Sequence, residues 1–301
     1  MKAELSTVFL GIISSAATAW ITYFFTRRSD ESRLETEKRL EQKFKYFFPF
    51  KNECIEFKHR VKHIARDLSG FRGNNDGVKK INQAKMKAHF KEGSTLDIPS
   101  EKTDWFFVDF YSRPINGNPI IPGGYFFTST LYMHCLLFRQ ITILQNEYPF
   151  MSVELNKFSP PKSAGADTGD VEFFNYCKKV VSQESVGIGY RNKLVEIREK
   201  GPIQSINTLI EAIRLSTVFS GGLPYNMHIS FGAYVMKGDG IISYEEFCTE
   251  LTNKSTLTKF LPLIRFWQKL GSDDGDVQSE AIQSLCALYV ALENIEYCDL
   301  K

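Results

Sequence analysis

The sequence has almost no excess of charge of either sign. Its 37 lysines and arginines are nearly balanced by 35 aspartates and glutamates, so the net charge of the 301-residue chain is only +2 at pH 7. Proteins that bind nucleic acid through its phosphate backbone carry a marked positive excess. The composition therefore argues against nucleic acid as a partner.

The sequence also lacks the cysteine spacing of a metal site or a disulfide framework. None of its six cysteines belongs to a C-x-x-C pair, and most lie in apolar helical patterns. A free cysteine in such a pattern behaves as a small hydrophobic residue. This usage is typical of a reducing compartment and argues against structural disulfides and zinc. The six are Cys54, Cys135, Cys177, Cys248, Cys286 and Cys298.

No cofactor-binding motif is complete. Residues 186–190, VGIGY, resemble part of a phosphate-binding glycine loop, but they lack the G-x-G-x-x-G spacing and a strand before it. His59 and His63 lie one helical turn apart, as zinc ligands can, yet the lysines and arginines around them would repel a cation. We therefore expect no cofactor and no bound metal at these places.

No catalytic motif is complete either. His134 beside Cys135, and His228 near Asp239, are the candidate groups for a hydrolase. Neither pair has a motif that fixes a nucleophile beside a base, and His134 lies in a strongly apolar stretch typical of a packed core. We predict that the protein is not an enzyme, with a hydrolytic enzyme of unknown class as an alternative.

Long hydrophobic runs are scarce, and only residues 5–26 form one without any charge. A helix of that length would measure about 33 Å, enough to cross a hydrocarbon core of about 30 Å. We predict a transmembrane helix over residues 5–26, which leaves residues 1–4 as a short extracytoplasmic N-terminus. The lipid bilayer is then the first expected partner.

The flanks of this run predict its orientation. Trp20 and the aromatic residues at 23–25 gather at its C-terminal end, and Arg27 and Arg28 follow, whereas the N-terminal flank offers only Lys2 and the α-amine. Aromatic rings prefer the headgroup level, and basic residues stay on the cytoplasmic side. We expect an inner (plasma) membrane protein that passes the membrane once, with its C-terminal part in the cytoplasm.

A cleaved signal peptide is the alternative for the same run. Residues 17–19, Ala-Thr-Ala, have the form of a cleavage site. The n-region has no net positive side-chain charge, however, and the apolar run continues past Ala19. A retained anchor is therefore the preferred interpretation.

Small residues form one face of the expected anchor. Gly11, Ser15 and Ala19 recur every four residues. Such faces let membrane helices approach closely and associate. The spacing predicts self-association of the anchor, and hence a homo-oligomer.

The rest of the chain is predicted to be mainly helical. Residues 27–48 read as a juxtamembrane helical stalk, and residues 49–301 as a cytoplasmic helical-bundle domain, with a proline- and glycine-rich stretch at 157–169 that could subdivide it. Residues 125–147 read as the central buried helix, and a second membrane pass is the alternative. Helical periodicity occurs at 49–68, 78–90, 125–147, 170–183, 203–219, 244–251, 257–270 and 277–295.

Two basic stretches of this domain are candidate binding surfaces, at 58–66 and at 79–91. The second stretch would suit an acidic partner or a membrane surface. The alternative interpretation is that both are ordinary solvated surface. Changing either stretch should impair binding if it is a partner surface.

Residues 235–246 resemble the second half of an EF-hand calcium loop. Asp239, Ser243 and Glu246 match positions five, nine and twelve, but Val235 and Lys237 occupy positions that need oxygen ligands. The same residues fit a capping box, in which Ser243 and Glu246 satisfy backbone N–H groups at a helix start. We predict the helix start, with a calcium-responsive regulator as the alternative.

Four sets of short motifs in the chain can be compared with a known family. They are Tyr46, Pro49, Glu56, Arg60 and Ile64; residues 129–132 with 143–144; residues 243–247 with 260–263; and residues 285–292. Together they resemble an uncharacterised family of bacterial single-pass, mainly helical membrane-anchored proteins. This resemblance implies architecture and location but brings no known activity. With no catalytic site in view, we predict an interaction or signalling protein with an unknown protein partner.

Overall fold

The computed structural model describes most of the chain. It covers residues 2–71, 76–91, 125–147, 152–155, 168–182, 196, 201, 203–218, 227–238 and 240–300. Only the backbone is described at residues 2–19, 76–78, 125, 168, 218, 252, 254 and 300. The chain divides into two compact units, Met1–Phe48 and Pro49–Lys301.

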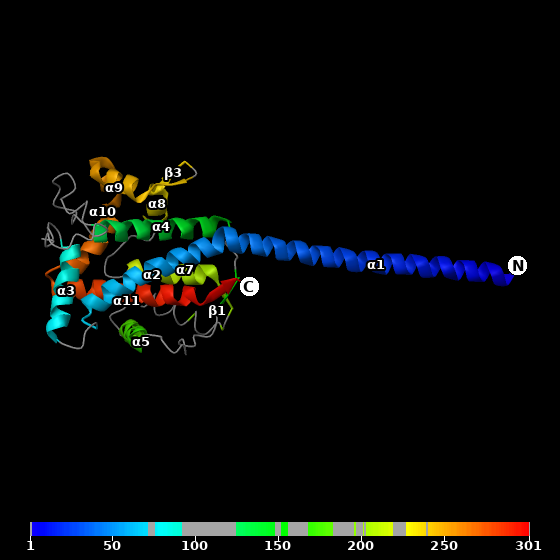
Figure 1. Cartoon of the computed structure of the whole chain (residues 1–301), viewed down its shortest axis with the longest axis horizontal. Coiled ribbons are helices and arrows are strands. Elements are labelled where there is room, and N and C mark those ends of the chain that lie inside the picture. Colours follow the sequence, from blue (N-terminus) through cyan, green and yellow to red (C-terminus); the bar gives the residue numbers. More distant parts are fainter. Residues whose placement is uncertain are drawn as a thin grey trace, which may run out of the picture. The chain divides into compact units, whose positions relative to one another are not determined.

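The first unit is one long helix. Helix α1 (Lys2–Gln42) runs unbroken for 41 residues and ends in a short π-helical turn, η1 (Lys43–Phe47) (Figure 1). At 1.5 Å per residue α1 is about 60 Å long. The expected anchor and the expected stalk therefore share one continuous helical backbone.

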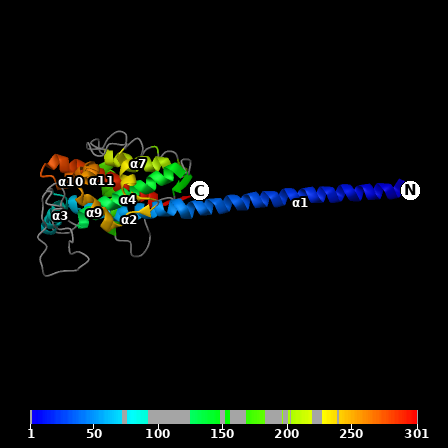
Figure 2. The ribbon, with the colours of Figure 1, turned by 90° about the horizontal axis from the view of Figure 1, so that it is seen from above.

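The second unit is a helical bundle with two small sheets. Its helices α2, α4, α7 and α11 run in roughly the same direction, and α3 lies across one end of them (Figures 1 and 2). The helices are α2 (Phe48–Leu68), α3 (Asp76–Phe90), α4 (Tyr125–Glu147), α5 (Thr168–Ser182), α7 (Ile206–Val218), α8 (Met227–Tyr234), α9 (Tyr244–Thr252), α10 (Lys254–Gln268), the 3-10 turn η4 (Lys269–Gly271) and α11 (Gly275–Glu296).

Helix α11 occupies the centre of the bundle. Every residue from 284 to 293 is buried, and the helix packs against α5 and α7. Residues 284–293 are mostly alanine, leucine and other apolar residues on every side of the helix. A helix that is apolar on all sides is typically buried on all sides. The side of α2 that carries Phe50, Phe57 and Ile64 contributes to the same core.

The strands are short. Strand β1 (Ser152–Leu155) pairs antiparallel with both β2 (Ile203–Ser205) and β5 (Cys298–Leu300), with Val153 opposite Gln204 and Leu300. Strands β3 (Met236–Lys237) and β4 (Gly240–Ile241) form a hairpin, in which Gly238 takes a positive φ of 61°. Such a φ favours glycine because a Cβ atom would crowd the backbone.

The expected mainly helical fold is confirmed, and α4 has the bounds predicted for the central helix. No helix in the part of the chain that the structure describes is both long and apolar enough to cross a membrane. The expected span at 5–26 has a helical backbone, but the side chains of its residues 5–19 lie outside the described part. The same holds for the small-residue face of Gly11, Ser15 and Ala19.

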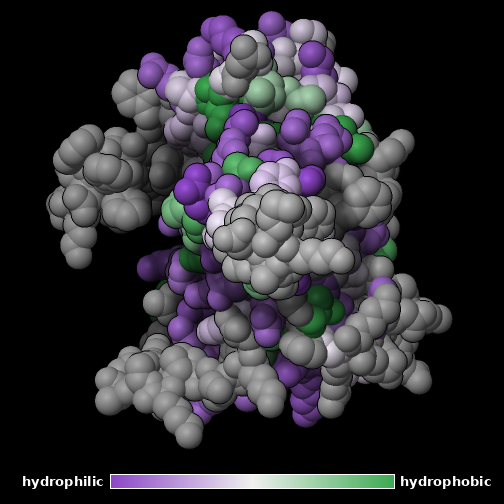
Figure 3. All heavy atoms as spheres, turned by 90° about the vertical axis from the view of Figure 1, so that its right-hand side faces the viewer, coloured by the Kyte–Doolittle hydropathy of each residue, from purple (hydrophilic) through white to green (hydrophobic). Residues whose placement is uncertain are grey.

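One face of the molecule is drawn in Figure 3. Its described side chains are mostly hydrophilic, and the hydrophobic ones form small separate patches. Singly exposed hydrophobic residues are normal on a protein surface. The larger exposed apolar groups among the described residues gather instead on α1.

Candidate functional site

An aromatic belt surrounds much of α1 at residues 20–25. Trp20, Ile21, Tyr23, Phe24 and Phe25 are between 50% and 67% exposed. At 3.6 residues per turn these five cover more than half of the helix circumference. We call them the aromatic belt.

The aromatic belt leaves a large apolar surface without intramolecular cover. The rings of Trp20 and Phe24 stack on each other, with centroids 5.7 Å apart, but this contact hides little of either ring. Burying one large apolar side chain stabilises a protein by about 1.5–3 kcal/mol. A surface of this kind marks a place where a membrane or another protein binds.

The chemistry of α1 changes directly after the aromatic belt. Arg27 pairs with Glu31 at 3.0 Å and Arg33 pairs with Glu37 at 3.4 Å, all four side chains being largely exposed. Such i,i+4 pairs each contribute only about 0.3–0.5 kcal/mol to a helix in water. These exposed ion pairs indicate that the part of α1 beyond Arg27 lies in water.

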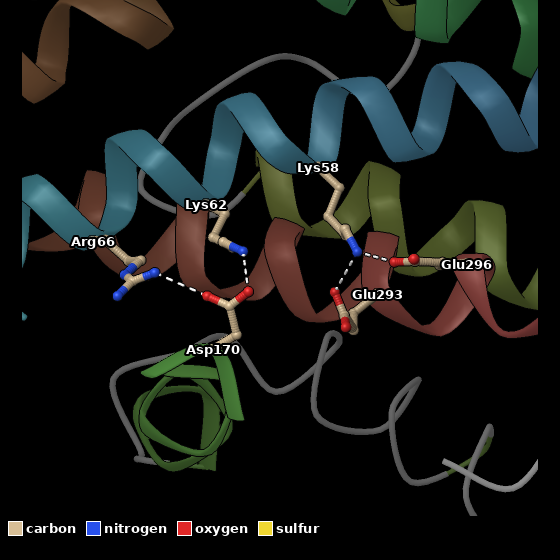
Figure 4. A network of polar contacts seen from close by, with 6 residues as sticks. All are labelled: Lys58, Lys62, Arg66, Asp170, Glu293 and Glu296. Atoms are coloured by element: carbon tan, nitrogen blue, oxygen red, sulfur yellow. Dashed lines mark hydrogen bonds and ion pairs between the residues drawn. The ribbon is translucent and has the colours of Figure 1, made fainter. Parts of the chain in front are cut away.

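A row of cations on α2 was the candidate partner surface at 58–66. Lys58, Lys62 and Arg66 recur every four residues on one side of the helix, and Figure 4 shows all three turned toward carboxylates of other helices. Lys58 is only 5% exposed and its Nζ lies 3.0 Å from Glu293 Oε2. It also contacts Glu296, so the first cation of the row is bound to α11.

The other two cations of the row bind α5. Lys62 Nζ donates to Asp170 Oδ2 at 2.7 Å, and Arg66 Nη1 donates to Asp170 Oδ1 at 2.9 Å (Figure 4). The prediction that residues 58–66 form a solvated basic face or a partner surface is therefore wrong for these three residues. Their partners lie more than 100 residues later in the chain, and no local pattern reveals them.

His134 is a packed core residue, as its apolar setting predicted. Its side chain is fully buried, and Trp267 Nε1 donates a hydrogen bond to its Nδ1 at 3.1 Å. The ring lies between Phe57 and Phe138, with centroid distances of 4.8 and 4.4 Å. Burial and the neighbouring His228 lower the pKa of His134 well below its ordinary value, so the imidazole is neutral.

His228 continues the same stack of rings. Its ring lies parallel to that of Phe138 at 4.4 Å, and its Nε2 is 3.0 Å from Thr217 Oγ1. Burial, helped by the charge of Arg214, lowers the pKa of His228 to about 3. We call Phe57, His134, Phe138 and His228 the ring stack. Asp239, the expected companion of His228, lies outside the described residues.

Cys135, the expected companion of His134, is packed in the core beside it. The thiol is fully buried, and burial raises the pKa of Cys135 well above its ordinary value. A thiol that stays protonated is a poor nucleophile. All six cysteines are free and buried, in agreement with their interpretation as small hydrophobic residues.

The predicted helix start at Ser243 is confirmed. Ser243 Oγ accepts a hydrogen bond from Glu246 N at 3.1 Å, and Glu246 Oε2 accepts one from Ser243 N at 2.9 Å. Glu246 Oε1 also pairs with Lys237 Nζ at 3.0 Å. The Ser243 amide, and then the Lys237 ammonium, hold the pKa of Glu246 below its ordinary value.

These contacts occupy both carboxylate oxygens that a calcium loop would need from Glu246. His63 is likewise engaged: its Nε2 lies 3.8 Å from Asp67 Oδ2, while His59 is exposed. Across the residues that the structure describes, no group of three or more histidines, cysteines, aspartates and glutamates is placed to hold a metal ion.

Comparison with known proteins gives no match. No family model matches the chain, and no curated protein or solved structure matches it. The resemblance to a family of bacterial membrane-anchored proteins therefore stays a prediction.

Proposed function

We propose that the protein is a membrane-anchored interaction or signalling protein. Residues 5–26 hold it in the inner (plasma) membrane, and residues 49–301 form a helical domain on the cytoplasmic side. The observation that carries the proposal is the aromatic belt, because its large rings are exposed around α1 and nothing described in the chain covers them.

The position of the aromatic belt fits the boundary of a bilayer. It lies between the uncharged run that ends at Thr26 and a stretch that opens with Arg27 and Arg28. Tryptophan and tyrosine are enriched at headgroup level, and basic residues are retained on the cytoplasmic side. Lipid would thus cover the rings, while water would solvate the ion pairs that follow on α1.

The hydrolase alternative loses the two groups on which it depended. The two histidines that could have served a hydrolase belong to the ring stack, where both are buried and neutral. Catalytic acids and bases need access to a substrate and a pKa near the working pH. The calcium alternative loses support for a similar reason, because the helix cap and Lys237 already engage Glu246.

Alkaline carbonate extraction of membranes tests the anchor. We expect the full chain to stay in the membrane pellet, because carbonate removes peripheral but not spanning proteins. The variant Ile13→Lys places a charge in the middle of the run, which costs about 2.5–3.5 kcal/mol at a helix centre, and should shift the protein to the soluble fraction.

Ser32→Lys is the matched control, because Ser32 lies on the solvated part of α1 and is exposed. This variant should stay in the pellet like the unchanged chain. If the unchanged chain is extracted by carbonate, or if Ile13→Lys and Ser32→Lys behave alike, the membrane-anchored function is wrong.

A further inference from the structure

Helix α4 carries an arginine beside the hairpin of β3 and β4. Arg139 Nε donates a hydrogen bond to Met236 Sδ, and Met236 lies opposite Ile241, so these two side chains share one side of the hairpin. Ile241 keeps 42% of its surface exposed, whereas Arg139 and Met236 are half-buried. Tyr132, two turns before Arg139, holds the hairpin by donating to Ile242 O at 2.6 Å. The hairpin and α4 therefore form one continuous surface.

The backbone beneath Arg139 is held in place by α8. A Cβ atom on Gly232 would lie 2.7 Å from Arg139 N, so the backbones of α8 and α4 touch at this point. The two helices lie side by side in Figure 1. The guanidinium is thus presented from a fixed position, and its planar fork loses little conformational freedom when it binds a carboxylate.

A carboxylate of α2 lies close to this arginine. Arg60 lies over the ring of Phe126, and Phe57 lies against His134. An earlier residue of α2 thus meets a later residue of α4, so the two helices run antiparallel. Glu53, about one turn before Phe57, therefore lies beside the part of α4 that comes about one turn after His134.

Glu53 and Arg139 influence each other without forming an ion pair. Burial and the nearby Glu56 raise the pKa of Glu53, against the opposing effect of Arg139. Burial likewise lowers the pKa of Arg139, against the effect of Glu53. Neither side chain is ion-paired with any residue in the described ranges. Two half-buried charges of opposite sign have therefore lost part of their hydration without the compensation that a close pair gives.

A surface that carries both signs of charge is complementary to a second copy of itself. In a two-fold dimer each residue meets its counterpart's neighbour in both directions, so one carboxylate and one guanidinium make two ion pairs across the contact. Arginine and methionine are also enriched where proteins bind each other. We call the group made of Glu53, Arg139, Met236 and Ile241 the Glu53–Arg139 surface.

We propose that two copies of the chain associate through the Glu53–Arg139 surface. Glu53 of each copy pairs with Arg139 of the other, and the side chains of Met236 and Ile241 pack between the two ion pairs. The contact lies within the helical domain. This inference therefore does not depend on the membrane anchor.

Cross-linking of an introduced cysteine tests the proposal in the full chain solubilised in detergent. Ile241→Cys should give a linked dimer with a short bis-maleimide, because the two copies of this position lie close together in the proposed contact. The six native cysteines are buried and should not compete. The matched control is Glu280→Cys, which places the cysteine at an exposed position of α11 and should give no linked dimer.

Charge reversal makes the test specific. Arg139→Glu or Glu53→Arg, each added to Ile241→Cys, should lower the yield of linked dimer by about tenfold or more, because like charges then face each other. An equimolar mixture of these two proteins should restore the yield, since every pair across the contact again joins a carboxylate to a guanidinium. Arg265→Glu reverses an exposed arginine of α10 and should leave the yield unchanged.

The restored yield in the mixture also shows that both reversed chains are folded. The proposal is overturned if Ile241→Cys gives no linked dimer, or no more than Glu280→Cys. Equal losses in Arg139→Glu and Arg265→Glu would overturn it as well. A mixture that links no better than its two components would have the same consequence.

Discussion

The two buried histidines, His134 and His228, are kept neutral by the rings around them. Their folded pKa values lie below the ordinary value of 6.5, that of His228 at about 3. In the unfolded chain both would take up a proton as the pH falls below about 6.5. The unfolded state therefore binds more protons than the folded state in this range, and acid favours unfolding.

We predict an acid-sensitive fold. The contribution of the two neutral histidines is fully present above pH 6.5 and is lost progressively as the pH falls toward about 3. Each contributes a slope of about 1.4 kcal/mol per pH unit once the unfolded side chain is protonated. Urea unfolding at pH 7.5 and at pH 5 measures this loss.

The variant His228→Asn should reduce that loss by about a third, since His89, whose pKa burial lowers to about 4, titrates in the same range as the two ring-stack histidines. The control is Ser32→Asn, at an exposed position of α1 that carries no titratable group, and this variant should leave the difference between the two pH values nearly unchanged. Equal pH dependence in the unchanged chain and in His228→Asn would show that the ring stack does not set the acid response.

The cation row of α2 gives a second prediction at the residue scale. Lys58→Met leaves the buried Glu293 without its cation, and breaking a buried pair in this way costs about 3–5 kcal/mol. Lys62→Met should cost about 1 kcal/mol or less, because its partner Asp170 is 42% exposed. Chemical denaturation measures the free energy of unfolding of both variants.

A double variant separates charge burial from lost packing. Lys58→Met with Glu293→Gln should recover part of the stability, because the uncompensated charge is removed. The cost of Glu293→Gln alone is measured as well. If the unfolding free-energy costs of the two single variants simply add in the double variant, the two side chains act independently and the ion pair has no role.

At the scale of elements, the attachment of α3 depends on one close approach of backbones. A Cβ atom on Gly271 would lie 2.4 Å from Lys91 N and 2.5 Å from Phe90 C. These are backbone atoms at the end of α3, so they cannot turn aside as a side chain can. The absence of a Cβ at this position lets η4 and α3 touch.

We predict that Gly271→Ala displaces α3. The forced shift should destabilise the domain by about 1–3 kcal/mol, as overpacking usually does. Thermal unfolding measures the loss, and faster hydrogen exchange in α3 should accompany it. Gly275→Ala is the control, because a Cβ there meets nothing within 4 Å. Equal effects of the two variants would mean that the close approach does not fix α3.

Several elements could be predicted from the sequence because their patterns are local. The stripe from Phe50 to Leu68 predicted α2, the apolar stretch from Tyr125 predicted α4, and Ser243 with Glu246 predicted the start of α9. The five strands and α8 were missed. Runs of two to eight residues are too short for a period to show.

Long-range pairing could not be read from the chain either. Lys58, Lys62 and Arg66 look like a solvated face because no carboxylate lies three or four residues from any of them in the sequence. Only the fold brings Glu293 and Asp170 beside them. The prediction of an exposed basic face at 58–66 was therefore wrong for function as well as for structure, since a cation that is already paired offers little to a partner.

At the scale of the whole molecule, the account joins two units with different chemistry. The first exposes an aromatic belt on a single helix, and the second buries its own aromatic rings and pairs its buried charges. The uncharged run and its flanks were visible in the sequence, and they carry the proposed location. No comparable local pattern indicates the domain's role, because binding surfaces depend on side chains that the fold brings together.

The central claim is that α1 crosses the membrane with the domain on the cytoplasmic side. Labelling of introduced cysteines in sealed membrane vesicles by a membrane-impermeant maleimide tests it most directly, because the native cysteines are buried. We predict that Ile13→Cys reacts only after detergent is added, and that Leu34→Cys, at an exposed position of α1, reacts in inside-out but not in right-side-out vesicles. Reaction of Ile13→Cys in intact vesicles, or of Leu34→Cys from the outside, would contradict the account.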